Sequence, residues 1–194
     1  MNRRRISLIT LLCTMVLAVV GSGLATAAEE IRIGFTPPVT GIHAAGGSLQ
    51  VKAIKLALKE INAAGGVNGK QIDLRIIDNQ SSNPGALAAL QKAVDQEKVL
   101  ALVGCLYSTQ VLATADAIKN YGIPTIIGAT NVNITKQGNP WLFRVRPDDS
   151  IAAGAMVKYI KENTKFTKIG ILHDADALAP AAPTWWKRAP RRRG

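Results

Sequence analysis

The chain has 194 residues, of which 47% are hydrophobic and only 5% aromatic, so we expect one domain, or one and part of a second, with an aliphatic α/β core. The net charge of +11 resembles that of a nucleic-acid-binding protein, but residues 1–27 carry +3 and residues 178–194 carry +5. The segment between these two ends, residues 28–177, contains 16 basic and 13 acidic residues. Nucleic acid binding requires basic residues clustered on one surface, and this nearly balanced segment shows no such cluster, so we expect no nucleic acid partner.

Residues 1–27 are predicted to be a secretory signal peptide. A basic start, MNRRR, precedes the apolar run ISLITLLCTMVLAVV, and Ala25-Thr26-Ala27 forms a small-residue cleavage site. The alternative is a transmembrane anchor, but the run is shorter than the roughly 20 residues that a span needs. We therefore expect a periplasmic protein. Cleavage leaves Cys105 as the one cysteine, so no internal disulfide is expected.

The rest of the chain alternates strand and helix patterns. Apolar runs of strand length alternate with segments in which apolar residues recur at helical spacing, and Gly- and Pro-containing turns separate them. In chain order, the predicted elements are strand 31–35, helix 48–64, strand 71–78, helix 83–96, strand 99–103, helix 109–120, strand 123–127, strand 142–145, helix 151–163 and strand 168–172.

This order predicts an α/β fold with a doubly wound parallel sheet. In such sheets ligands bind outside the carboxyl ends of the strands, at the point where the strand order reverses. The loops where a ligand site is expected are therefore 36–47, 104–109 and 128–135.

The loop Gly104-Cys105-Leu106-Tyr107-Ser108-Thr109 joins a buried strand to a helix. A helix start offers free N–H groups and a partial positive charge, which favour a carboxylate or phosphate, and Ser108 and Thr109 add hydroxyl groups. The alternative is that one of these two hydroxyls only caps the helix. Both interpretations stay open on the sequence alone.

A second loop, Gly128-Ala129-Thr130, follows the next strand. Glycine allows a ligand to approach the backbone closely, and Thr130 offers a hydroxyl. The alternative is an ordinary turn. Two such loops on neighbouring strand ends support a ligand site better than either does alone.

Several segments together resemble type I periplasmic binding proteins, most closely the leucine/isoleucine/valine-type substrate-binding subunits of ABC transporters. The resemblance covers about residues 29–177. The segments that carry it are IRIGFTPPVTG, KEINAAGGVNGKQIDLRIIDNQSSNP, LVGCLYSTQ, IPTIIGATN, NPWLFRVRPDDS and IGILHD. These segments are specific as a set.

The resemblance implies a two-lobed protein that closes on a small ligand and hands it to an ABC permease in the membrane. Residues 28–146 would form the first lobe, which stays incomplete, and residues 147–177 would begin the second. We expect a monomer that binds an amino acid of the branched-chain type, or a similar small carboxylate or amide. The alternative is a periplasmic sensing module that feeds a receptor.

The site residues follow from the same resemblance. The positions that hold the α-carboxylate and α-amino groups of the ligand in the family correspond to Ser108, Gly128, Ala129 and Thr130, with Thr109 a weaker candidate. An aromatic of the first loop is replaced by Gly46, so we expect that wall of the site to be open. The cysteine pair of some members is also missing, with Ser82 and Tyr107 in its place.

Residues 178–194 are interpreted as an aberrant basic tail. They hold two tryptophans and five basic residues, without helix or strand periodicity. One base inserted into a GC-rich back-translation gives FGPGGADLVEARA, which restores the aromatic-Gly-x-Gly element of the family. We therefore expect a frameshift or sequencing error near Leu178, and a polypeptide that is poorly soluble and binds no ligand tightly. A natural arm for nucleic acid or a membrane interface is the alternative.

The sequence does not favour an enzyme. His173-Asp174 could act as a base and its orienting partner, but no nucleophile in a fitting motif accompanies them. Cys105 is predicted to be a small packed thiol. Two histidines and one mature cysteine are too few and too scattered for a metal site, and no cofactor motif is present.

Overall fold

The computed structural model describes residues 30–166 and 168–170. The strands are β1 (Ile31–Phe35), β2 (Ile72–Ile76), β3 (Ala101–Val103), β4 (Thr125–Ile127) and β5 (Leu142–Arg144). The helices are α2 (Ala44–Ala63), α3 (Asn83–Gln91), the π-helical turn η1 (Lys92–Gln96), α4 (Ser108–Tyr121), the 3-10 turn η2 (Ile134–Lys136) and α5 (Asp149–Asn163).

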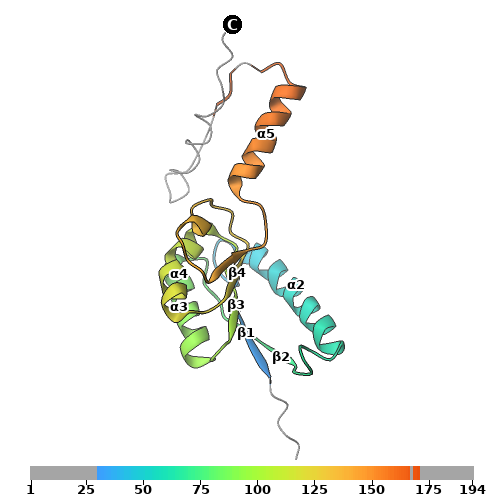
Figure 1. Cartoon of the computed structure of the whole chain (residues 1–194), viewed down its shortest axis with the longest axis vertical. Helices are drawn as coiled ribbons and strands as arrows, with labels where there is room; N and C mark the ends of the chain where they lie inside the picture. Colours follow the sequence, from blue (N-terminus) through green and yellow to red (C-terminus); the bar gives the residue numbers. More distant parts are fainter. Residues whose placement is uncertain (1–29, 167, 171–194) are drawn as a thin grey trace, which may run out of the picture.

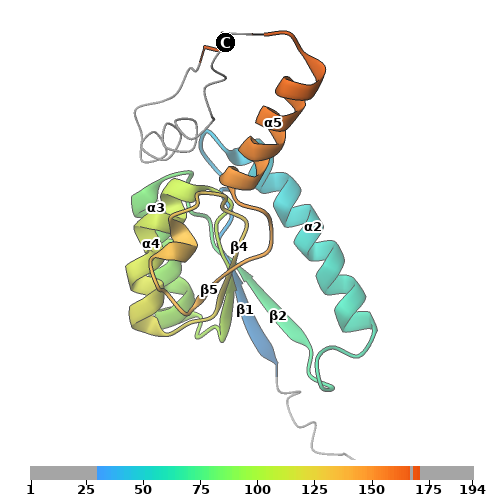
Figure 2. The ribbon, with the colours of Figure 1, turned by 45° about the horizontal axis from the view of Figure 1, so that its top comes forward.

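The five strands form one parallel sheet in the order β2-β1-β3-β4-β5. Figures 1 and 2 show α2 on one face of this sheet and α3 with α4 on the other. The predicted doubly wound α/β sheet is confirmed. The strand order reverses between β1 and β3, so this pair marks the topological switch point.

The apolar core lies between the sheet and the pair α3 and α4. Small and branched side chains of the two helices meet those of the strands there, because alternate strand residues point to this face. The buried members include Ala86, Ala89, Leu90, Leu102, Val111, Ala115, Ile118 and Ile127. This packing fixes the carboxyl ends of β3 and β4 and the start of α4, and the site loops connect to these points.

Helix α2 covers β1 and β2 more loosely. Gly47 is its one buried residue, and a Cβ atom at that position would lie 1.8 Å from the carbonyl oxygen of Pro38. Near the other end of the helix, the side chain of Asn62 donates to the carbonyl of Ile72 (3.0 Å) and accepts from its N–H (2.9 Å). The helix is therefore attached mainly through its two ends.

Several elements differ from the sequence prediction in their limits or type. The first helix begins at Ala44 rather than at residue 48, because the close approach to Pro38 lets Gly46 and Gly47 join its first turn. The predicted helix 83–96 ends in the π-helical turn η1. The predicted strand 168–172 is wrong for residues 168–170, which pair with no described strand, and its last two residues lie outside the described part.

Helix α5 extends away from the sheet, beyond the carboxyl ends of the strands (Figure 1). Its start is capped by Asp148, whose carboxylate accepts from the N–H groups of Ser150 and Ile151, and the N–H of Asp149 donates to Thr130 O (3.0 Å). Ala153 is its one buried residue. The division into lobes at residue 146 stays a prediction. The signal peptide and the tail 178–194 lie outside the described residues.

Candidate functional site

The loop after β1 is fixed by Asp78, which follows β2. The Asp78 carboxylate accepts hydrogen bonds from Val39 N (2.8 Å), Thr40 N (3.2 Å) and Thr40 Oγ1 (2.6 Å), and from Gln80 N (2.9 Å). Burial alone would raise the pKa of Asp78, but these hydrogen bonds outweigh it and hold the pKa below its ordinary value. An ionised Asp78 therefore clamps this loop to its neighbour.

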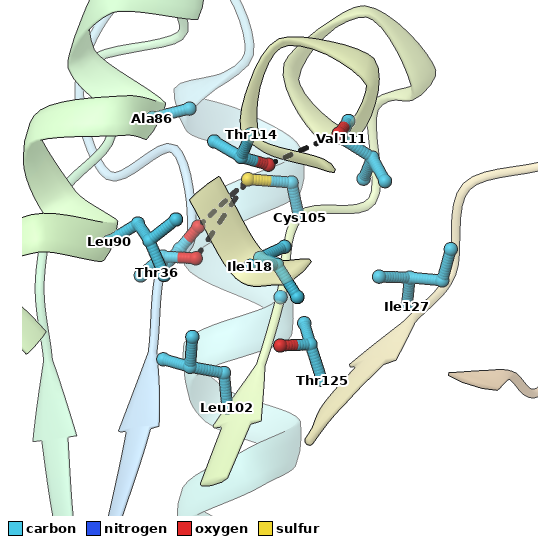
Figure 3. Close-up of a pocket in the computed structure, with 11 residues that line it drawn as sticks. Thr36, Ala86, Leu90, Leu102, Cys105, Val111, Thr114, Ile118, Thr125 and Ile127 are labelled. Atoms are coloured by element: carbon cyan, nitrogen blue, oxygen red, sulfur yellow. Dashed lines mark hydrogen bonds between the residues drawn. The ribbon is translucent and has the colours of Figure 1, made fainter. Parts of the chain in front are cut away.

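A buried polar cluster lies beneath the loops. Asn79 Nδ2 donates to the carbonyl of Thr36 (2.8 Å) and to the side chain of Gln110 (3.2 Å), and it also contacts Cys105 Sγ (3.4 Å). Figure 3 shows Thr36 and Cys105 beside a small cavity between the sheet and the helices. With about 10 Å³, that cavity has room for about one water molecule.

Cys105 is packed as the sequence predicts. It is 4% exposed, and burial raises the pKa of its thiol above the ordinary value. A protonated thiol with no access to solvent is a poor nucleophile. The hydrogen bonds of this cluster therefore support the loops above it.

Ser108 is the first residue of α4, and it is not the helix cap. The cap position is Tyr107, which makes no side-chain cap bond, so the interpretation of Ser108 or Thr109 as a cap is wrong. Ser108 Oγ instead accepts from the backbone N–H of Asn131 (3.2 Å), which leaves its own proton free to donate. Thr109, the next residue, is half-buried.

The second loop lies directly against the first. A Cβ atom on Gly128 would lie 2.6 Å from Leu106 Cδ1, so the glycine lets the two loops touch. Ala129 is fully buried, and Thr130 is half-buried. Within residues 30–166 and 168–170, the N–H groups of Gly128, Ala129 and Thr130 donate to no other residue. Two predicted site segments are thus adjacent in space.

Arg144 holds this arrangement together, a role that the sequence patterns did not indicate. Its guanidinium donates to the carbonyl of Asn131 (2.9 Å) and to Thr135 Oγ1 (2.5 Å), and it lies 3.7 Å from the Asp148 carboxylate. The side-chain amide N–H₂ of Asn131 is buried and unpartnered among the described residues. The signal that points to Asn131 is its position directly after Gly128-Ala129-Thr130.

The open wall at Gly46 stays a prediction, but the structure shows which side chain lies beside this position. A Cβ atom at Gly46 would lie 3.1 Å from the hydroxyl oxygen of Tyr107, so this hydroxyl takes up space that a side chain would need. The Tyr107 ring stacks on His43, with ring centroids 3.8 Å apart and an interplanar angle of 16°. The sequence alone did not indicate this proximity, because Tyr107 and Gly46 lie on different helix starts.

These residues can bind an anionic group. The free N–H groups of the 128–130 loop, the Ser108 hydroxyl and the start of α4 are all hydrogen-bond donors or partial positive charges, which suit a carboxylate. In the described ranges no cluster of three or more His, Cys, Asp or Glu side chains could hold a metal ion. The His173-Asp174 pair lies outside them. No helix of the described part is long and apolar enough to cross a membrane.

Known proteins are similar to most of this chain in sequence. The sequence profile of a family described as periplasmic binding protein matches residues 30–193. An amino acid binding protein of Pseudomonas aeruginosa is 33% identical over 79% of this chain and 42% of its own length. A leucine-, isoleucine-, valine-, threonine- and alanine-binding protein of the same species is 32% identical over 84% of this chain and 43% of its own.

Solved structures of substrate-binding proteins are also similar to this chain. The branched-chain amino acid transporter substrate binding protein of Streptococcus pneumoniae, solved with isoleucine, superposes with a TM-score of 0.66 and 36% identity. The match covers 70% of this chain and 39% of that one. The chain therefore spans less than half the length of these relatives.

Proposed function

The chain belongs to the periplasmic binding protein family, and we propose that residues 28–146 form the first lobe of an extracytoplasmic solute-binding protein of an ABC importer and that residues 147–177 begin its second lobe. The ligand is an amino acid of the branched-chain type or a similar small carboxylate or amide. Residues 1–27 act as the export signal, and the partners are the ligand and a membrane permease. The protein works as a monomer and catalyses no reaction.

One observation carries this proposal: unpartnered donors lie on two adjacent loops at the strand ends. Ser108 and the N–H groups of residues 128–130 lie on two touching loops, at the start of a 14-residue helix. A ligand carboxylate would accept hydrogen bonds from these donors, and charge-assisted bonds of this kind are roughly twice as strong as neutral ones. The buried amide N–H₂ of Asn131 is a further donor for a bound water or ligand atom.

The polypeptide of residues 1–194 alone should bind weakly. The described donors form one side of a site, whereas small-molecule sites usually enclose most of the ligand surface. We expect a dissociation constant on the order of 1 mM for this polypeptide.

The test is a titration of the isotope-labelled chain with L-leucine, followed by amide chemical shifts. The shifts of Ser108 and of residues 128–130 should change with saturation, and leucinamide, which lacks the carboxylate, should have little effect. Ser108→Ala should weaken leucine binding about 10-fold, because a hydrogen bond to a charged group is lost.

The matched control is Ser150→Ala, which removes a hydroxyl from the exposed start of α5 and should leave leucine binding unchanged. Equal responses to leucine and leucinamide would contradict the carboxylate role of the two loops. The absence of any shift with both ligands would reject the proposed function.

A further inference from the structure

Two aromatic rings lie across the switch point of the sheet. His43 directly precedes α2, which follows β1, and Tyr107 directly precedes α4, which follows β3. Because β1 and β3 are neighbours whose helices leave on opposite faces, the stacked rings connect the two sides of the crevice in which such sheets bind ligands.

Residues other than His43 and Tyr107 fix the backbone beside each ring. The backbone N–H of His43 donates to Ser81 Oγ (3.1 Å), and Ser81 Oγ in turn donates to the carbonyl of Thr40 (2.6 Å). Tyr107 is adjacent in sequence to Ser108, which is tied to Asn131. A wall whose position is fixed before a ligand arrives can discriminate between ligands without a large ordering cost.

The polar atoms of the two rings are available. Both residues are half-exposed, and neither the Tyr107 hydroxyl nor the His43 imidazole has a hydrogen-bond partner in the part of the chain that the structure describes. The Tyr107 hydroxyl lies at the first turn of α2, close to Gly46. A ligand whose carboxylate is held at Ser108 would thus have a hydroxyl within the adjacent part of the crevice.

We propose that the His43–Tyr107 ring pair is a specificity wall that selects ligands with a hydrogen-bonding side chain over purely aliphatic ligands of the same size. This inference rests on the proposed function. The ligand side chain exchanges a hydrogen bond with the Tyr107 hydroxyl, and the stacked His43 ring keeps that hydroxyl in place. A purely aliphatic side chain would leave the hydroxyl unpaired on binding, which is unfavourable.

L-Threonine and L-valine are the matched probes, because they differ by a hydroxyl in place of a methyl group. The readout is again the amide shifts of Ser108 and of residues 128–130 in the full chain. Wild type should bind threonine about fivefold more tightly than valine, the effect of one net hydrogen bond. Tyr107→Phe keeps the ring but has no hydroxyl to pair or to leave unpaired, so it should remove this preference by weakening threonine binding and by leaving valine binding equal or somewhat tighter.

Two variants test the role of His43. His43→Ala removes the stacking partner and should reduce the preference for threonine, whereas His43→Phe keeps a stacked ring and should restore most of it. An unchanged amide spectrum outside residues 40–50 and 104–110 verifies that each variant is folded.

The outcomes separate this inference from the function on which it rests. If threonine and valine both shift Ser108 and residues 128–130 but bind equally, or if Tyr107→Phe keeps the preference, the specificity wall is wrong and the proposed function stands. If neither amino acid shifts these residues, both are wrong.

Discussion

At the scale of single residues, Asp78 determines the shape of the first loop. Its carboxylate accepts hydrogen bonds from Val39, Thr40 and Gln80, so the chain after β1 and the chain after β2 share one anchor. The N–H of Val39 and the hydroxyl of Thr40 both depend on the charged form of this anchor.

The Asp78 clamp should make folding stability depend on pH. The pKa of Asp78 is lower in the folded chain than its ordinary value of 3.8, so the clamp contributes stability above about pH 4. This contribution should be lost as the pH falls through the lowered pKa. Asp78→Asn should be less stable than wild type at pH 7 and should show a shallower loss of stability below pH 4.

Urea unfolding at a series of pH values measures this dependence. Asp116→Asn, which changes an exposed carboxylate on α4, serves as the control and should keep the wild-type pH profile. An identical profile for Asp78→Asn and wild type would show that the clamp does not depend on the charge.

Residue identity alone did not reveal which side chain lies beside Gly46. The family resemblance implies that an aromatic is replaced there, and an open wall is predicted from that replacement. The side chain beside Gly46 is that of Tyr107, which lies 61 positions further along the chain. Its hydroxyl reaches Gly46 only because the fold places the starts of α2 and α4 next to each other. The hydrogen bond between Ser108 and Asn131 was not predicted either, because it also joins residues that are distant in sequence. Each of the two loops was predicted separately.

At the scale of elements, the start of α2 depends on one close contact. The carbonyl oxygen of Pro38 occupies the space in which any other residue at position 47 would place its Cβ atom. Because Gly47 has no Cβ atom, the first turn of the helix can pack against the loop after β1. Because the contact is with backbone, a larger residue cannot be accommodated by a change of rotamer.

Gly47→Ala should therefore destabilise the fold by about 1–3 kcal/mol, the usual cost of overpacking a well-packed position. Gly154→Ala is the control: it lies in α5, has no neighbour within 4 Å, and replaces a poor helix former by a good one. The urea midpoint should fall for Gly47→Ala and stay the same or rise slightly for Gly154→Ala. A midpoint unchanged by Gly47→Ala would show that α2 does not depend on the Pro38 contact.

The boundaries of elements with strong apolar patterns could be predicted from the sequence. The boundaries that depend on tertiary contacts were predicted less accurately. The runs 31–35 and 142–145 match β1 and β5 to within one residue, because their side chains alternate on the sheet. The start of α2 moved by four residues, since the Gly46-Gly47 pair reads as a loop unless its contact with Pro38 is known.

At the scale of the whole molecule, the sheet has an apolar area that no described element covers. Thr125 and Ile127 point into the core, so Ile126 between them points to the opposite face, where Phe143 pairs with it in register. Ile126 is 45% exposed and Phe143 51%, because α2 covers β1 and β2 instead (Figure 2).

This uncovered face should promote association of the polypeptide of residues 1–194. Exposed contiguous apolar patches bind apolar dyes and cause self-association. Phe143→Lys should lower both dye fluorescence and light scattering, whereas Tyr159→Lys, the same change of charge on exposed α5, should lower them less. Equal effects of the two variants would mean that net charge alone controls association.

Because α2 is attached mainly at its two ends, it should unfold locally before the rest of the fold. A helix that is held at Gly47 and Asn62, with only exposed and half-buried residues between them, can detach from β1 and β2 without disturbing the core around α3 and α4. It should therefore form a local unfolding unit with an opening free energy below that of global unfolding. Since α2 carries Gly46 and follows His43, each such opening would separate the stacked rings and briefly remove one side of the crevice.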